Sequence, residues 1–148
     1  MKKFLLFQFI IFLLILFSNL YSEEIKKEQL IFITNQKNSI QEISKKDIKN
    51  IYLGKKKKWT NKIKIIPVLN SSENVEKEFY KLIGKTKTKY EKYWDKMVFT
   101  GKGNPPLKME NNVKIIDYIK KNEGAISFIS IQDTISEKSI KILKIKNK

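Results

Sequence analysis

Apolar positions along the chain fall into short continuous runs separated by helically spaced sets. Residues 30–33 (LIFI) form a run of strand-favouring side chains, the pattern of a strand covered on both faces. A similar run spans residues 63–69, where Pro67 favours an edge strand or the last ladder position. Residues 125–129 and 140–145 complete the predicted strands, and the isoleucine–lysine alternation of the last indicates an exposed face.

Four helices are predicted between these strands. Ser44 begins the first, with Asp47 as its capping-box partner and Gly54 at its end. Residues 70–72 supply capping chemistry for the second, which ends at Gly84. The other two carry apolar side chains at helical spacing, namely Tyr90, Tyr93, Trp94, Met97 and Val98 in one and Val113, Ile116 and Ile119 in the other.

The order of these elements predicts the fold class. Strands that alternate with helices favour an α/β fold with a mixed or mostly parallel sheet flanked by helices. Residues 100–106 (TGKGNPP) are dense in glycine and proline, so they predict a loop. No internal repeat and no low-complexity linker divides the chain after residue 22, which favours a single domain.

The N-terminus has the pattern of a secretory signal peptide. Two lysines precede the apolar run 4–17, and Ser22 provides a small residue before the predicted cut. The run is shorter than the roughly 20 residues that span a bilayer, so an uncleaved anchor fits less well. No cysteine follows it, which excludes a lipoprotein anchor. We therefore predict a signal peptide at 1–22, a domain at 23–148, and a periplasmic or secreted location.

The amino-acid composition excludes several classes of catalytic and metal-binding site. The chain has 31 basic residues, all lysine, 15 acidic residues, no histidine and no cysteine. This excludes histidine and cysteine relays, thiolate nucleophiles, disulfides and His/Cys metal sites. The acidic residues follow no pattern of a glycosidase or of an acidic cation-binding loop. We therefore expect a non-enzymatic protein without a cofactor or metal.

The formal charge of +16 permits binding to polyanions. Abundant lysine, isoleucine and asparagine with scarce arginine, alanine and glycine are typical of an AT-rich coding bias, so we expect no nucleic-acid partner. Two interpretations fit the run Lys55–Lys58: contact with anionic lipid headgroups, lipopolysaccharide or another polyanion, or a solvated loop. For the adjacent Trp59, sealing the edge of the core is favoured over stacking on a base.

Several sequence blocks occur in a specific order. They are IYLGK at 51–55, Trp59, EFY at 78–80, YW at 93–94, VFTGKGNPP at 98–106 and GAISF at 124–128. In this order, behind a signal peptide, they resemble the short phosphate ABC transporter substrate-binding-like proteins of the type 2 periplasmic binding protein superfamily. The resemblance extends over residues 30–145, and its specificity comes from the succession of blocks.

This resemblance implies a single lobe of such a protein. In full-length relatives two α/β lobes close on a dehydrated phosphate held by backbone N–H groups, hydroxyls and an arginine. This chain has about half that length, so hinge closure between lobes cannot occur within one copy. It also lacks the arginine, and Glu73 stands where a negative charge opposes a dianion.

Two segments are candidates for anion binding. The first is the predicted helix start, where free N–H groups and the positive end of the helix dipole suit an oxyanion. Simple capping is the alternative, with Glu73 as the N3 partner of Asn70. The candidate residues of this segment are Asn70, Ser71, Ser72 and Asn74.

The second candidate segment is the glycine-containing loop. Two glycines around Lys102 let successive N–H groups converge into a nest, to which the lysine adds a charge. A plain glycine turn with Lys102 in solvent is the alternative. The candidate residues of this segment are Thr100, Gly101, Lys102 and Gly103.

Two hypotheses of function follow. The first is a solute-binding-like protein for phosphate or a related oxyanion, linked to an ABC transporter. The second is a non-catalytic interaction module that docks on an envelope sensor, a transporter or an anionic polymer and holds no small ligand. The expected partners are accordingly phosphate or a similar oxyanion, an ABC transporter permease or envelope sensor protein, and a second copy in a homodimer.

Overall fold

The computed structural model describes residues 8, 12–13, 29–131 and 138–146. Residues 8, 12 and 13 are helical, and the rest of the predicted signal peptide lies outside the described residues. Within the described part, no helix has both the length and the apolar character needed to cross a membrane. The signal peptide and its cut after Ser22 remain predictions.

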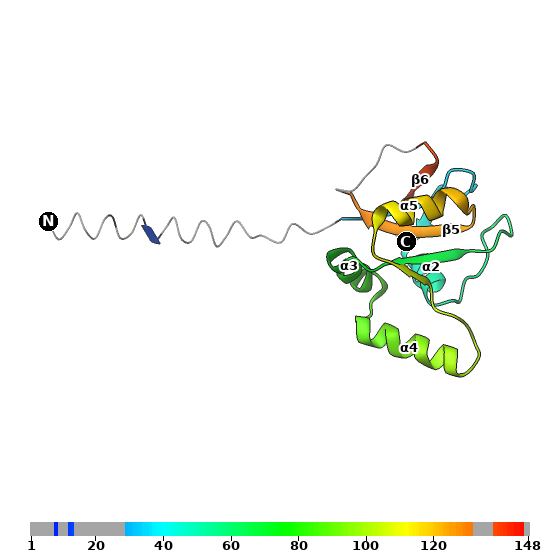
Figure 1. Cartoon of the computed structure of the whole chain (residues 1–148), viewed down its shortest axis with the longest axis horizontal. Helices are drawn as coiled ribbons and strands as arrows, with labels where there is room; N and C mark the ends of the chain where they lie inside the picture. Colours follow the sequence, from blue (N-terminus) through cyan, green and yellow to red (C-terminus); the bar gives the residue numbers. More distant parts are fainter. Residues whose placement is uncertain (1–7, 9–11, 14–28, 132–137, 147–148) are drawn as a thin grey trace.

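A mixed sheet of six strands lies at the centre of the described chain (Figure 1). Its strand order is β2-β6-β1-β5-β3-β4. β1 is antiparallel to its neighbours β5 and β6, whereas β2 and β6, β5 and β3, and β3 and β4 are parallel pairs. The strands are β1 (Leu30–Asn35), β2 (Glu42–Ser44), β3 (Ile66–Asn70), β4 (Leu107–Met109), β5 (Ala125–Ser130) and β6 (Ile140–Lys146).

Helices cover both faces of this sheet (Figure 1). Successive strand residues point to opposite faces, so Phe32 packs in one buried cluster with α2, α3 and α4, and Ile33 packs in the other with α5. In Figure 1, α4 lies outermost on its side and α5 lies on the opposite side of the sheet. The helices are α2 (Lys45–Tyr52), α3 (Glu73–Ile83), α4 (Lys87–Phe99) and α5 (Asn112–Lys121).

Tyr52, the last residue of α2, joins most of the elements on the α2–α4 side. Its side chain is fully buried, and its ring meets Phe79 of α3 and Phe128 of β5 at centroid distances of 4.7 and 5.7 Å. The hydroxyl donates to the Val68 carbonyl of β3 at 3.0 Å. Burial raises the pKa of Tyr52 well above its usual range, so the hydroxyl stays a proton donor.

The α/β fold class and the mixed sheet flanked by helices are confirmed. β1, β3, β5 and β6 correspond to the predicted strands, and each predicted helix is present. Ser44 caps α2 as expected, because its Oγ accepts from the N–H of Asp47 at 3.0 Å. The sequence did not predict β2 and β4, which have three residues each and no apolar run.

Pro67 lies in an interior strand, so the expectation of an edge strand is wrong, whereas its position is the last pair of the β3–β5 ladder. Ile66 N donates to Gly124 O at 3.0 Å, which places the bonding groups of residue 66 on the β5 side. The nitrogen of the next residue faces the β4 side, where pairing begins only at Val68. The missing N–H of Pro67 therefore lies where β4 has not yet begun.

The segment from residue 29 onward has the parts of an independent domain. Each of the six strands finds its partners within this segment, and both buried clusters consist of residues between Leu30 and Ile145. A chain that starts at residue 23 therefore keeps the sheet, the four covering helices and both clusters.

Gly124 provides a test of the contact between β3 and β5. A Cβ atom at this position, just before β5, would lie 2.0 Å from the backbone oxygen of Lys64, just before β3, and Gly124 O also accepts from Ile66 N. We expect Gly124→Ala to lower the free energy of unfolding by about 3 kcal/mol in urea denaturation. Gly103→Ala is the matched control, because its Cβ would make an ordinary contact at 3.6 Å with Trp94. Equal losses in the two variants would contradict the proposed clash.

Candidate functional site

Asn70, the last residue of β3, is fully buried and connects three elements. Its Nδ2 donates to Asn112 Oδ1 of α5 at 2.8 Å and to Phe128 O of β5 at 3.0 Å. Its Oδ1 accepts from the backbone N–H of Ser72 at 3.1 Å and from the Ser72 hydroxyl. The polar atoms of this side chain are therefore occupied within the protein, and Asn70 orients the site around it. The expectation that Asn70 caps the helix is wrong, since Ser72 is the N-cap.

The start of α3 is not capped by a side chain. The Ser72 hydroxyl bonds to Asn70, whereas the N-cap side chains of α2, α4 and α5 each accept from their own helix. The first intrahelical bond of α3 runs from Glu76 N to Ser72 O at 2.9 Å. Within the described residues, the N–H groups of residues 73–75 donate to no hydrogen-bond acceptor. These donors and the helix dipole form the positive end of α3.

Ser71 lies directly before this helix start. Its backbone N–H donates to Met109 O of β4 at 2.9 Å, which fixes the residue against the sheet. Its Oγ is buried, and among the buried side-chain polar atoms of the described residues it is the one without a hydrogen-bond partner. Buried hydroxyls normally find a partner, so this atom is the one at which a ligand oxygen would satisfy an unmet bond.

Acidic residues also lie near the start of α3. Glu73 is exposed in its first turn, and Glu110 follows Met109. Glu76 is only 5% exposed and accepts from Lys87 Nζ at 2.8 Å. The hydrogen bond to Glu76 raises the pKa of Lys87, so this lysine stays charged in the pair. The unpaired negative charge in the first turn is therefore that of Glu73.

A second hydrogen bond on Glu76 comes from the neighbouring turn of α3. The hydroxyl of Tyr80 donates to Glu76 Oε1 at 3.1 Å. Burial, followed by the charge of Glu76, raises the pKa of Tyr80 well above its usual range. The Tyr80 hydroxyl thus stays protonated and remains a donor to the Glu76 side chain. This bond stabilises the first turns of α3.

The loop after α4 does not form the expected nest. The N–H groups of Thr100, Gly101 and Lys102 donate to carbonyls of the last turn of α4 at 2.9–3.0 Å, and Gly101 has a φ of +64°. This is a Schellman ending, in which the glycine satisfies helix carbonyls. The hydroxyl of Thr100 donates to Lys96 O at 2.8 Å, and Lys102 is exposed. Because the donors face the helix, the nest interpretation is wrong and the glycine turn describes the loop.

The two candidate segments lie at opposite ends of the β3–β4 pair. These strands are parallel. Residues 70–72 follow the end of β3, whereas residues 100–103 precede the start of β4. A Cβ at Gly103 would lie 3.6 Å from the Trp94 ring, which places this loop beside the middle of α4. The structure therefore does not bring the eight predicted residues into one site.

The lysine run 55–58 follows the α2 terminus. Lys56 pairs with Asp47 at 3.0 Å, and Lys55, Lys57 and Lys58 are exposed. Trp59 is buried and its Nε1 donates to Gly124 O at 3.0 Å, which confirms that it seals the edge of the core.

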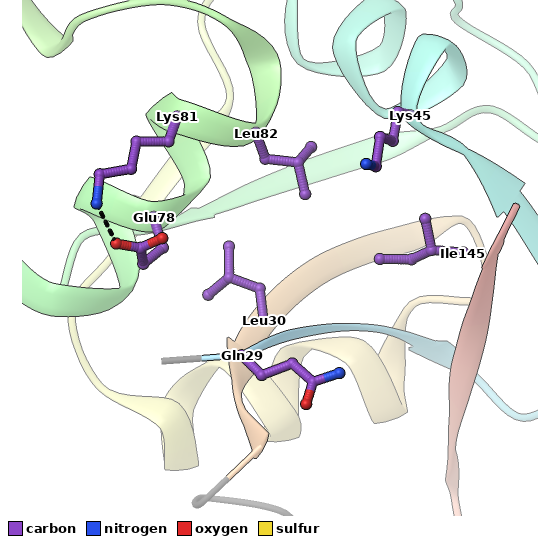
Figure 2. Close-up of a pocket in the computed structure, with 7 residues that line it drawn as sticks. All are labelled: Gln29, Leu30, Lys45, Glu78, Lys81, Leu82 and Ile145. Carbon is purple, nitrogen blue, oxygen red and sulfur yellow. Dashed lines mark hydrogen bonds and ion pairs between the residues drawn. The ribbon is translucent and has the colours of Figure 1, made fainter. Parts of the chain in front are cut away.

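A surface hollow of about 680 Å³ lies on the α2–α3 side (Figure 2). Leu30, Leu82 and Ile145 face this hollow, and Glu78 and Lys81 pair with each other at 2.5 Å on its rim. None of the predicted anion-binding residues lines it. This hollow is therefore separate from the candidate anion-binding segment at the start of α3.

The sequence did not predict the role of Asn112. This residue lies in the first turn of α5, and its bond to Asn70 brings the starts of α3 and α5 together. The pair Asn111–Asn112 before a helical pattern was the available signal, because asparagine is a frequent N-cap. Asn111 does act as the N-cap of α5 and accepts from Val113 N at 2.8 Å.

The hydrogen bonds of Asn70 predict that an acidic variant at this position has a pH-dependent stability. Asn70→Asp would place an oxygen opposite two acceptors, Asn112 Oδ1 and Phe128 O. Burial and these acceptors raise the pKa of the introduced carboxyl in the folded state above its unfolded value of roughly 4. Stability should be highest below the unfolded pKa and fall as pH rises through the folded pKa. We expect a loss of about 3 kcal/mol at pH 7, measured by urea denaturation.

The control for this variant is Asn74→Asp. Asn74 is exposed in the first turn of α3, where the helix dipole favours a carboxylate. We expect unchanged or slightly higher stability at pH 7 in this control. A similar pH profile for the two variants would argue against the buried network.

Comparisons with known proteins identify the fold. Neither the protein-family models nor the curated protein sequences give a match. Among solved structures, an ABC-type phosphate transport receptor from Vibrio cholerae matches with a TM-score of 0.64 and 22% identity, over 82% of this chain and 47% of that one. A phosphate ABC transporter substrate-binding protein from Clostridium perfringens, solved with bound phosphate, matches with a TM-score of 0.63 and 19% identity, over 80% and 45%.

A third match shows the same relation. PstS from Borrelia burgdorferi has a TM-score of 0.60 and 18% identity, over 81% of this chain and 48% of that one. The chain thus spans about half the length of these binding proteins. The fold resemblance expected from the ordered sequence blocks is confirmed: the chain has the fold of part of a phosphate ABC transporter substrate-binding protein.

Proposed function

We propose that the protein is an exported, non-enzymatic binding protein for phosphate or a related oxyanion, with its site at the start of α3. One observation carries the proposal: the buried hydroxyl of Ser71 has no partner among the described residues and lies beside a helix start that no side chain caps. The fold likeness to a substrate-binding protein with bound phosphate supports it.

In this proposal, an anion oxygen accepts from the Ser71 hydroxyl and from N–H groups of the first turn of α3. Backbone donors and the helix dipole favour such an ion without a basic side chain. Asn70 contributes by orienting Ser72 and the backbone, because its side chain is fully used inside the protein. Thr100, Gly101, Lys102 and Gly103 are left out of this site, since they lie at the other end of β4.

The proposed site binds the anion from one side only. The chain spans about half of the matched binding proteins. We therefore expect weak binding by a single copy and tight enclosure only where a second copy or another protein covers the anion. A transporter permease and an envelope sensor are the partner classes that fit an exported binding protein.

The second candidate function is an interaction module without a small ligand. The uncompensated charge of Glu73 at the helix start favours this alternative, because it opposes a dianion. The two functions differ in their response to phosphate, which makes direct titration decisive.

Removal of the Ser71 hydroxyl should weaken phosphate binding without lowering the stability of the fold. We expect Ser71→Ala to bind phosphate at least roughly tenfold more weakly in calorimetric titration, because a hydrogen bond to a charged group is lost. Its free energy of unfolding should not fall, since the hydroxyl has no partner in the free protein. Thr60→Ala removes an exposed hydroxyl elsewhere and should change neither quantity.

Two results would overturn the site. The first is the absence of both heat and thermal shift with the wild-type chain at millimolar phosphate and sulfate. The second is a loss of stability in Ser71→Ala, which would show that the hydroxyl has a structural partner.

Glu73 predicts an effect of the opposite sign. Glu73→Gln removes a negative charge from the first turn of α3 and keeps the size of the side chain. We expect phosphate affinity to rise by roughly two- to fivefold at low ionic strength, and the gain to shrink as salt screens the charge. Glu123→Gln, an exposed acid elsewhere, is the control and should leave the affinity unchanged. A lower affinity of Glu73→Gln would show that this carboxylate contacts the ligand.

A further inference from the structure

The outer face of α4 carries a line of lysines that ends in an aromatic side chain. Lys89, Lys92, Lys96 and Phe99 follow one another at helical spacings of three and four residues, which places them on one stripe. The three lysines are exposed, and Phe99 is 93% exposed. On the opposite side of the helix, Tyr90 and Trp94 are buried. The phenylalanine thus has no role in the core.

The lysines of this stripe have no counter-ion. Within the described residues, Lys89, Lys92 and Lys96 form no ion pair. The acids of the helix, Glu91 and Asp95, lie on its flank, where they line a small hollow with Tyr90 and Pro105. The stripe therefore presents positive charge without compensation.

The helix holds this stripe rigidly at the margin of the protein. The hydroxyls of Tyr90 and Tyr93 donate to the Tyr52 and Leu53 carbonyls at 2.9 and 2.7 Å, and Trp94 Nε1 donates to Tyr52 O at 3.2 Å. α4 lies outermost on its side of the sheet, away from α5 (Figure 1). At 1.5 Å per residue, the stripe extends for about 15 Å along the surface.

From this surface we infer that the outer face of α4 docks on an anionic lipid bilayer. Phe99, at the end of the stripe, enters the headgroup region. Lys89, Lys92 and Lys96 extend their apolar stems along the interface and place their charges against lipid phosphates. Docking goes beyond the proposed anion site, which lies at the start of α3.

A bilayer fits this surface better than the other occupants. A second copy of a chain with a formal charge of +16 would bring like charges together. A soluble polyanion would satisfy the lysines but leave Phe99 in water. A bilayer has both negative headgroups and an apolar interior, so it satisfies the line of cations and its aromatic end together.

Vesicle binding tests the charges of the stripe. The chain from residue 23 is sedimented with vesicles of phosphatidylcholine, with and without a third of phosphatidylglycerol. We expect binding only to the anionic vesicles, and a loss on the order of 100-fold when Lys89, Lys92 and Lys96 are changed to glutamine. The control changes Lys37, Lys114 and Lys121 to glutamine, which removes the same charge from exposed positions on the side of α5.

An introduced cysteine tests the position of Phe99. The chain has no cysteine, so Phe99→Cys carries a single environment-sensitive dye, and Val113→Cys on α5 provides the matched label. We expect a blue shift and quenching by brominated lipid at residue 99 alone. Four results would each overturn the proposal. Two concern vesicle binding: no binding to the anionic vesicles, or equal losses in the two lysine variants. The other two are equal dye responses at residues 99 and 113, and heparin binding as strong as vesicle binding.

Discussion

The hydrogen bonds and ring contacts of Tyr52 connect α2 with α3, α4, β3 and β5 on one side of the sheet. Its ring lies against α3 and β5, its hydroxyl bonds to β3, and its carbonyl accepts from two aromatic residues of α4. A protonated phenol in an apolar core must find an acceptor, because an unpaired buried donor costs roughly 1–3 kcal/mol. The Val68 carbonyl is that acceptor, so the end of α2 has a single position against β3.

The position of β3 in turn determines the geometry around the start of α3. β3 ends at Asn70, whose side chain bonds to α5 and β5 and draws the Ser72 hydroxyl away from its own helix. Ser72 cannot cap α3 and bond to Asn70 at once. The uncapped helix start is thus a consequence of the packing at the end of β3, where one buried amide holds the Ser72 hydroxyl.

Sequence patterns predicted the strands that contain a continuous apolar run and the helices that carry apolar side chains at helical spacing. The runs at 30–33 and 125–129 gave buried strands, because both faces of β1 and β5 are covered. β4 escaped prediction, since its three residues are held by pairing with β3 and two of them are exposed. The role of Asn70 also escaped, because its partners Asn112 and Phe128 lie 42 and 58 residues away in the sequence. Local patterns contain no information about such contacts.

The two candidate segments, residues 70–74 and 100–103, show why local chemistry alone does not define a site. A glycine next to a lysine suits an anion nest and a Schellman ending equally well, and the choice depends on whether helix carbonyls compete for the N–H groups. After α4 they do, so Gly101 ends a helix. Before α3 no carbonyl competes for the first-turn donors, because they open the helix. The direction of the helix relative to the loop therefore decides which of the two segments leaves its backbone N–H groups without a helix carbonyl.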